Sequence, residues 1–135
     1  MTSRVLGLDH GTKRVGIALS DPGRVVAHPF EVVARAVAVA RVHALAEEHE
    51  VSLIVIGLPT SLSGAEGSAA RGAREFGEEV RTATGRQVLF VDERFTSNTA
   101  EKAMIEAGTR RRRRREAIDM VAATVILQSF LDRPQ

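Results

Sequence analysis

The stretch at residues 3–20 reads SRVLGLDHGTKRVGIALS and decides how the chain begins to fold. Its apolar residues gather at 3–9 and again at 14–20, which is typical of two strands. The residues between them, 10–13, include Gly11, which adopts turn conformations at little steric cost. The sequence therefore predicts that the chain opens with an antiparallel hairpin.

The rest of the chain predicts three more strands separated by helices. His28 and Pro29 lie in an expected strand at 24–30, and the proline places this strand at an edge of the sheet or at its own end. The continuous apolar run at 51–56 is typical of a strand covered on both faces. A last strand is expected at 87–91, and helices are expected at 33–50, 65–84, 98–107 and 116–131. This order predicts one α/β domain over residues 1–135, with a five-stranded mixed sheet made of a three-strand antiparallel meander plus two parallel strands, flanked by helices.

Composition limits the classes of function. The chain has no cysteine, which excludes disulfides and thiolate metal sites and is compatible with a cytoplasmic location. No apolar run approaches membrane-spanning length, so we expect no membrane association. Trp and Tyr are absent and only 5 Phe are present, so stacking of bases on aromatic side chains is not expected to dominate recognition.

Positive charge is concentrated in one short stretch. The chain has 19 Lys and Arg against 17 Asp and Glu, and without the six consecutive arginines the acidic residues outnumber the basic ones. So dense a run attracts polyanions, with nucleic acid as the leading partner. We expect a mobile loop that holds phosphates without reading sequence, the alternative being a solvated loop with no partner. The run consists of Arg110, Arg111, Arg112, Arg113, Arg114 and Arg115.

Three acids lie where a metal site could form. Asp9 ends the first strand, Glu93 follows the strand at 87–91, and Asp119 lies on an apolar helix face. Together their oxygens would suit Mg²⁺ or Mn²⁺, which take carboxylates and water. Each acid also has an ordinary explanation, because Asp9 could stabilise a turn and Glu93 could pair with Arg94 on the surface. Asp119 is the hardest to explain in this way, since burying a lone acid is costly.

These residues belong to a wider pattern. The sequence resembles the YqgF family of RNase H-like nucleases, described as Holliday junction resolvases or pre-16S rRNA nucleases. The resemblance implies that Asp9, Glu93 and Asp119 form a metal-binding catalytic triad on an RNase H-like five-stranded mixed sheet. It covers nearly the whole chain and rests on LGLDHGTKRVG at 6–16, Ser20-Asp21, GLP at 57–59, DERFTS at 92–97, the arginine run, and Ile118-Asp119 with Ala122-Ala123.

Basic and polar residues beside the acids are candidates for binding phosphate. Thr12 and Lys13 lie in the first turn, where ordinary turn chemistry is the alternative explanation. Arg14 begins the second strand and Arg94 follows Glu93. Arg94 would either bind phosphate or orient that carboxylate.

Other positions leave their roles open. His10 could assist proton transfer near Asp9, or it could be a solvent-exposed turn residue. Ser61 and Ser63 stand where the resemblance leads us to expect Asn and Asp, so a charge role of that loop is in doubt. Their hydroxyls can still contact phosphates.

These features point to three classes of function. Asp9-x-Gly11-Thr12 is similar to the first phosphate motif of sugar kinases and actin-like ATPases, but those proteins bind nucleotide between two lobes and this chain has room for one. An inert nucleic-acid-binding module would leave the three acids unexplained. We therefore expect a metal-dependent endonuclease on structured nucleic acid. The resemblance alone favours processing of the 5′ end of pre-16S rRNA over Holliday junction resolution in DNA recombination and repair, and a homodimer is left open.

Overall fold

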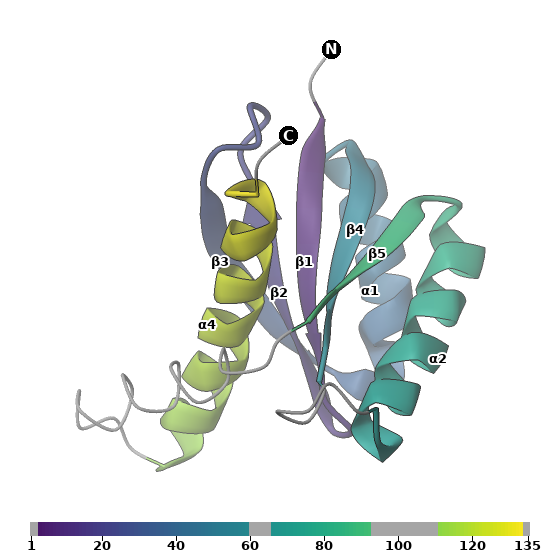
Figure 1. Ribbon diagram of the computed structural model, residues 1–135, viewed down its shortest axis with the longest axis vertical. Helices are drawn as coiled ribbons and strands as arrows, with labels where there is room; N and C mark the ends of the chain where they lie inside the picture. The colour runs from purple at the N-terminus through teal and green to yellow at the C-terminus, as the bar shows by residue number, and fades with distance from the viewer. Residues whose placement is uncertain (1–2, 60–65, 93–110, 134–135) are drawn as a thin grey trace.

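The computed structural model describes residues 3–59, 66–92 and 111–133 of the chain. The elements in this part follow one another in the order β-β-β-α-β-α-β-α (Figure 1). They are β1 (Arg4–His10), β2 (Arg14–Ser20), β3 (Ala27–Ala34), α1 (Arg35–Glu48), β4 (Val51–Leu58), α2 (Ser68–Thr84), β5 (Gln87–Asp92) and α4 (Arg111–Leu131). The helix expected at 98–107 lies outside the described residues.

The five strands form one mixed sheet in the order β3-β2-β1-β4-β5. The pairs β1–β2 and β2–β3 are antiparallel, whereas β1–β4 and β4–β5 are parallel. The meander, the two parallel strands and the edge position of the third strand are therefore confirmed. The register places Asp9 of β1 opposite Gly16 of β2.

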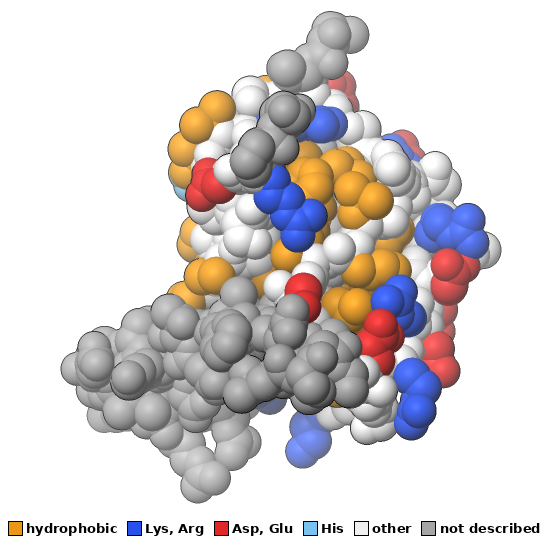
Figure 2. All heavy atoms as spheres, in the orientation of Figure 1, with side chains coloured by type: hydrophobic (Ala, Val, Ile, Leu, Met, Phe, Trp, Pro, Cys, Tyr) orange, Lys and Arg blue, Asp and Glu red, His pale blue; other side chains and the backbone are white. Residues whose placement is uncertain are grey.

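Helices cover both faces of the sheet. α1 and α2 pack on one face, and α4 lies alone on the other among the described elements, mainly over β1, β2 and β3 (Figure 1). Alternation along β1 sends Leu6 and Leu8 into the core under α1 and α2, and Val5 into the core under α4. Figure 2 shows apolar side chains at the surface beside α4, over the parallel strands, where Leu89 is only partly buried. We call the side of the sheet that carries α4 the α4 face.

The third strand begins and ends later than expected. The sequence predicts this strand at 24–30, and the structure has it at Ala27–Ala34. Residues before it form a turn closed by Asp21, whose carboxylate accepts the amides of Val25 and Val26 at 2.8 Å each. Pro29 is tolerated because β3 is an edge strand and the register shifts beside it, between Ile17 and Ala18 of β2.

The arginine run is helical over its described part, which corrects the expectation of a mobile loop. The last helix was expected to begin at Glu116, but α4 begins at Arg111. Arginine is a good helix former, and like charges four residues apart cost only about 0.2–0.5 kcal/mol per pair. The buried residues Ala123 and Leu127 anchor the helix on the sheet, and extending an existing helix is far easier than starting one.

Over the described ranges 3–59, 66–92 and 111–133, no helix combines the length and apolar character needed to cross a membrane.

Candidate functional site

Asp119 is held directly over Gly16 of β2. A Cβ atom built at Gly16 would collide with the main-chain oxygen of Asp119 and would lie 3.3 Å from its Cβ. Ala123, one turn further along α4, is fully buried, and its main-chain oxygen lies close to Gly7 of β1. The two glycines thus let α4 approach the sheet closely, and this close approach fixes the position of Asp119.

Asp9 faces the same helix. A Cβ atom at Gly7 would lie 2.6 Å from Leu127 of α4, so Gly7 is on the α4 face, and Asp9, two residues later, shares that face. Asp9 is paired with Gly16, the residue over which Asp119 sits. The structure therefore brings together two of the three expected acids, from opposite ends of the chain, at the carboxyl end of β1.

The Asp119 carboxylate has a basic partner, Arg14 of β2. Arg14 Nε donates to Asp119 Oδ2 at 2.5 Å, and the two side chains are 32% and 23% exposed. Arg14 is two residues before Gly16 and so projects from the same face of β2. The expectation of Arg14 as a phosphate ligand therefore needs a refinement, because its guanidinium already binds an acid of the site.

The turn between β1 and β2 is tied down by main-chain hydrogen bonds. The Gly11 amide donates to the Arg14 carbonyl at 2.9 Å, and the Arg35 amide donates to the Lys13 carbonyl at 2.9 Å. A Cβ atom at Gly11 would lie 2.7 Å from the Arg14 carbonyl oxygen, so this position requires glycine. Thr12 and Lys13 are exposed on this fixed turn, beside the two acids.

A cavity of about 420 Å³ opens next to Arg14, between β3 and α4. Sequence reasoning did not single out its apolar walls, because they depend on how α4 packs against the edge strand. In a sequence, valines of a strand and a methionine of a helix look the same whether they line a cavity or pack in the core. The cavity is lined by Lys13, Arg14, Val32, Val33, Ala34 and Met120.

His10 belongs to the opposite face of the sheet from Asp9. Its ring packs on Phe76 with centroids 4.9 Å apart, and Arg35 Nε donates to His10 Nε2 at 3.0 Å. Burial, and then the charge of Arg35, lower the pKa of His10, which keeps the ring neutral and able to accept this hydrogen bond. Neither expectation for His10 fits: it joins the first turn to α1 and α2 instead of helping Asp9 or lying exposed.

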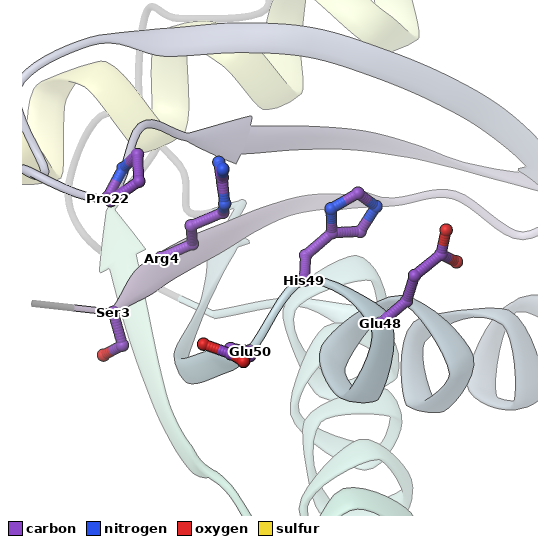
Figure 3. Close-up of a pocket in the computed structure, with 6 residues that line it drawn as sticks. All are labelled: Ser3, Arg4, Pro22, Glu48, His49 and Glu50. Atoms are coloured by element: carbon purple, nitrogen blue, oxygen red, sulfur yellow. The ribbon is translucent and has the colours of Figure 1, made fainter.

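The Ser20-Asp21 motif has a structural role far from the acids. Ser20 Oγ accepts the Val5 amide at 2.8 Å and donates to the Asp21 carbonyl at 2.9 Å. This end of the sheet holds a second cavity, of about 210 Å³, lined by Ser3, Arg4, Pro22, Glu48, His49 and Glu50 (Figure 3). The cavity lies at the start of β1, whereas Asp9 lies near its end.

Several expected site residues lie outside the described part of the chain. They are Glu93, Arg94, Ser61, Ser63 and Arg110; for Arg111 to Arg115 only the helical backbone is described. Within 3–59, 66–92 and 111–133, no group of three or more His, Cys, Asp or Glu side chains is placed to hold a metal ion.

A family model and individual relatives of this chain all have names that describe nucleases or resolvases. The family model described as "RuvX: Holliday junction resolvase" matches residues 3–133. A protein of Sulfurihydrogenibium sp. (strain YO3AOP1), 43% identical over 97% of this chain and 91% of its own length, is named "Putative pre-16S rRNA nuclease". A protein of Ruegeria pomeroyi with the same name is 42% identical over 97% of this chain and 87% of its own length.

Among solved structures, RuvC of T. thermophilus in complex with a Holliday junction substrate covers 96% of this chain and 93% of its own, with a TM-score of 0.54 and 17% identity. This likeness confirms the RNase H-like fold. Because the family model matches residues 3–133 of the 135, the chain belongs to the RuvX family.

Proposed function

We propose that this chain is a metal-dependent endonuclease whose catalytic acids are Asp9, Glu93 and Asp119. One observation carries the proposal. Asp9 is the strand partner of Gly16 and Asp119 of α4 lies over Gly16, so the two acids lie near each other on the α4 face of the sheet. Two acids placed together at the end of β1 have no evident role in packing, and membership of a nuclease family supports their use in phosphodiester hydrolysis.

The residues present fit a divalent metal ion in part. Asp9 and Asp119 offer the carboxylate oxygens that Mg²⁺ and Mn²⁺ prefer, and Arg14 demonstrates that a cationic group can sit against Asp119. Glu93, the third proposed ligand, is two residues beyond Val91, which is buried in the core under α4. When bound, a pair of such ions would supply an activated water molecule and stabilise the leaving oxygen.

The chain's own basic residues would hold the substrate. Lys13 is exposed on a fixed turn beside the acids, and Thr12 is its exposed neighbour. Arg94 and the run from Arg110 to Arg115 are proposed to bind further phosphates of the backbone. Such contacts position a nucleic acid but carry no sequence information, so cleavage specificity would come from the shape of the substrate.

The 5′ end of pre-16S rRNA is the substrate we favour. Relatives at 43% and 42% identity, matched over most of their own length, are named for this activity. The alternative is Holliday junction resolution, which the description of the family model favours. In either case the chemistry at the phosphodiester is the same, and only the substrate differs.

The test is a cleavage assay on matched substrates. Purified protein is incubated with a pre-16S 5′-end RNA and with a four-way DNA junction, each with Mg²⁺, with Mn²⁺ and with EDTA. We expect metal-dependent cleavage of the RNA at a defined position and slower or no cleavage of the junction. Preferential cutting of the junction would favour resolution, and no cleavage of either substrate with either metal would refute the endonuclease proposal.

A further inference from the structure

The cavity between β3 and α4 has two chemically different walls. One is basic and consists of Lys13 and Arg14 at the turn beside the catalytic acids. The other is apolar and consists of Val32, Val33 and Ala34 of β3 and Met120 of α4. The register explains why these groups meet: Val32 pairs with Gly16 and Ala34 with Arg14, so both project from the α4 face, where Met120 follows Asp119.

Size and charge limit what this cavity can hold. Its volume of about 420 Å³ lies within the range of small-molecule sites, about 300–1,000 Å³. Among the described residues that line it, Lys13 and Arg14 are basic and none is acidic, and the charge of Arg14 is shared with Asp119. Lys13 therefore supplies the free positive charge, which suits an anion with an apolar body. The cavity at the other end of β1 contrasts with it, because Glu48 and Glu50 in its lining would repel a phosphate (Figure 3).

We infer that this cavity binds one unpaired nucleotide of the substrate, adjacent to the phosphodiester that is cut. The base lies between Val32 and Met120, and its phosphate is held by Lys13, next to the guanidinium of Arg14 that is bound to Asp119. A thioether makes favourable contacts with aromatic rings, so Met120 can serve a base in a chain that has no Trp or Tyr. A base can enter such a cavity only when it is out of a helical stack.

This inference rests on the proposed function for its biological meaning and names the substrate more closely. A nucleotide must be unpaired beside the cut, so the substrate is a single-stranded segment or end, not a continuous duplex. The binding itself needs neither metal nor cleavage. Its test can therefore fail or succeed independently of the endonuclease proposal.

The test uses the methyl group of Met120 as a reporter. The chain has 3 methionines, Met1, Met104 and Met120, so the NMR spectrum of a protein labelled with methyl-¹³C methionine contains few methyl signals. The signal that disappears in Met120→Leu is that of Met120. AMP, adenosine and inorganic phosphate are titrated separately in EDTA. We expect AMP to shift the Met120 signal saturably at about 1–10 mM, and to bind more tightly than either adenosine or phosphate alone.

Three variants separate the cavity from general charge attraction. Lys13→Met should weaken AMP binding by about two- to fivefold, as loss of one partly exposed charge contact implies. Ala34→Leu should abolish the shift by filling the cavity; Ala34 makes no side-chain cap to α1, so α1 should be retained, and a melting curve checks this. Arg81→Met, which removes an exposed cation of α2, is the matched control and should change nothing.

Several results would overturn the inference. One is a Met120 signal that stays fixed up to about 20 mM AMP, and another is binding of adenosine or phosphate alone as tight as that of AMP. Equal AMP affinity in folded Ala34→Leu would place the nucleotide elsewhere. Loss of cleavage in the acid variants with intact AMP binding, in contrast, would leave the cavity assigned and bear only on the catalytic acids.

Discussion

Arg14 Nε lies 2.5 Å from Asp119 Oδ2, so a guanidinium from β2 is bound to an acid that we propose as a metal ligand. This contact places a positive charge against the Asp119 carboxylate. A metal ion that binds Asp119 must share or replace this partner. Arg14 is therefore expected to set how readily the site accepts a divalent cation.

Replacing Arg14 by Met should lower the melting temperature of the metal-free protein and raise its affinity for Mn²⁺. The loss of a partly exposed ion pair is worth about 1 kcal/mol or less, which corresponds to a gain in affinity of up to about fivefold. Mn²⁺ titration followed by EPR measures the affinity without any need for cleavage. Arg14→Lys is the control that keeps the charge. A lower Mn²⁺ affinity in Arg14→Met would mean that Arg14 positions Asp119 for the metal and does not compete with it.

Neutralising any one of the three acids should abolish cleavage. Asp9→Asn, Glu93→Gln and Asp119→Asn each remove a proposed ligand with little change of shape. Nucleic-acid binding should persist or become tighter, because a negative charge is lost near the backbone. Cleavage and filter binding are measured on the same RNA, with Glu75→Gln on the exposed surface of α2 as the matched control. Cleavage at the parental rate by any one of the three variants removes that residue from the site.

Mg²⁺ should stabilise the folded protein. A ligand that binds only the native state raises stability by RT ln(1 + [L]/Kd), which is about 2.7 kcal/mol at a hundred times Kd. The melting temperature is measured from 0 to about 20 mM Mg²⁺ and Mn²⁺, with the same range of Ca²⁺ for comparison. Asp9→Asn should lose most of the increase. An increase of equal size in that variant would show that the ions act elsewhere on the protein.

The arginines of α4 should make binding depend steeply on salt. If all six arginines of the run, Arg110 to Arg115, met duplex phosphates, the log–log slope would be about −5. Six adjacent side chains cannot all reach phosphates in one pose, so about half of that slope is expected. Replacing Arg111, Arg113 and Arg115 by Ala should flatten the slope and weaken all sequences alike. Alanine is the best helix former, so α4 should remain intact and a circular dichroism spectrum should confirm it. Arg81→Ala serves as the control, and an unchanged slope in the triple variant would exclude the run from the binding surface.

Asp21 should stabilise the fold in a way that disappears in acid. Hydrogen bonds from the amides of Val26, Val25 and Gly23 lower the pKa of Asp21 below its usual 3.8. A carboxyl whose pKa is lowered by folding stabilises the protein above the unfolded-state pKa, and the stabilisation is lost as the pH falls through the folded-state pKa. Asp21→Asn should therefore have a lower urea midpoint than the parent at pH 7, and the gap should close below about pH 3.

The matched control for this pH series is Glu75→Gln, which removes an exposed carboxylate from α2. It should show no such gap at pH 7. A gap in Asp21→Asn that is constant from pH 7 to about pH 2 would mean that the side chain contributes through its shape and not through its charge.

The sequence predicted those elements whose structure is determined by residues close to one another along the chain. Two apolar clusters around the turn at Gly11 predicted the hairpin of β1 and β2, and the apolar run at 51–56 predicted β4 as a buried strand, because both patterns are local. The predicted start of β3 was wrong because the Asp21 carboxylate accepts hydrogen bonds from the amides four and five residues later. These bonds hold the residues before Ala27 in a turn, so the strand begins later. The start of α4 was wrong because charge repulsion was given more weight than the helix propensity of arginine.

The site was predictable only as a set of candidate residues. Asp9 and Asp119 were identified by residue type and position, and the family resemblance joined them. The bond between Arg14 and Asp119 spans 105 residues and depends on the height of α4 above the sheet, which no local pattern encodes. The neutral, half-buried state of His10 likewise depends on contacts with α1 and α2.

The close contact of α4 with Gly16 and Gly7 has a mechanical consequence. α4 spans 21 residues, about 31 Å at 1.5 Å per residue, and is clamped to the sheet at Asp119 and Leu127. Arg111 precedes the first clamp by eight residues, about 12 Å of stiff helix. If the arginines bind nucleic acid as proposed, a force on them would act through this helix on the contact at Gly16, which also positions Asp119. A force on the N-terminal end of α4 and the position of Asp119 relative to Asp9 are therefore mechanically coupled.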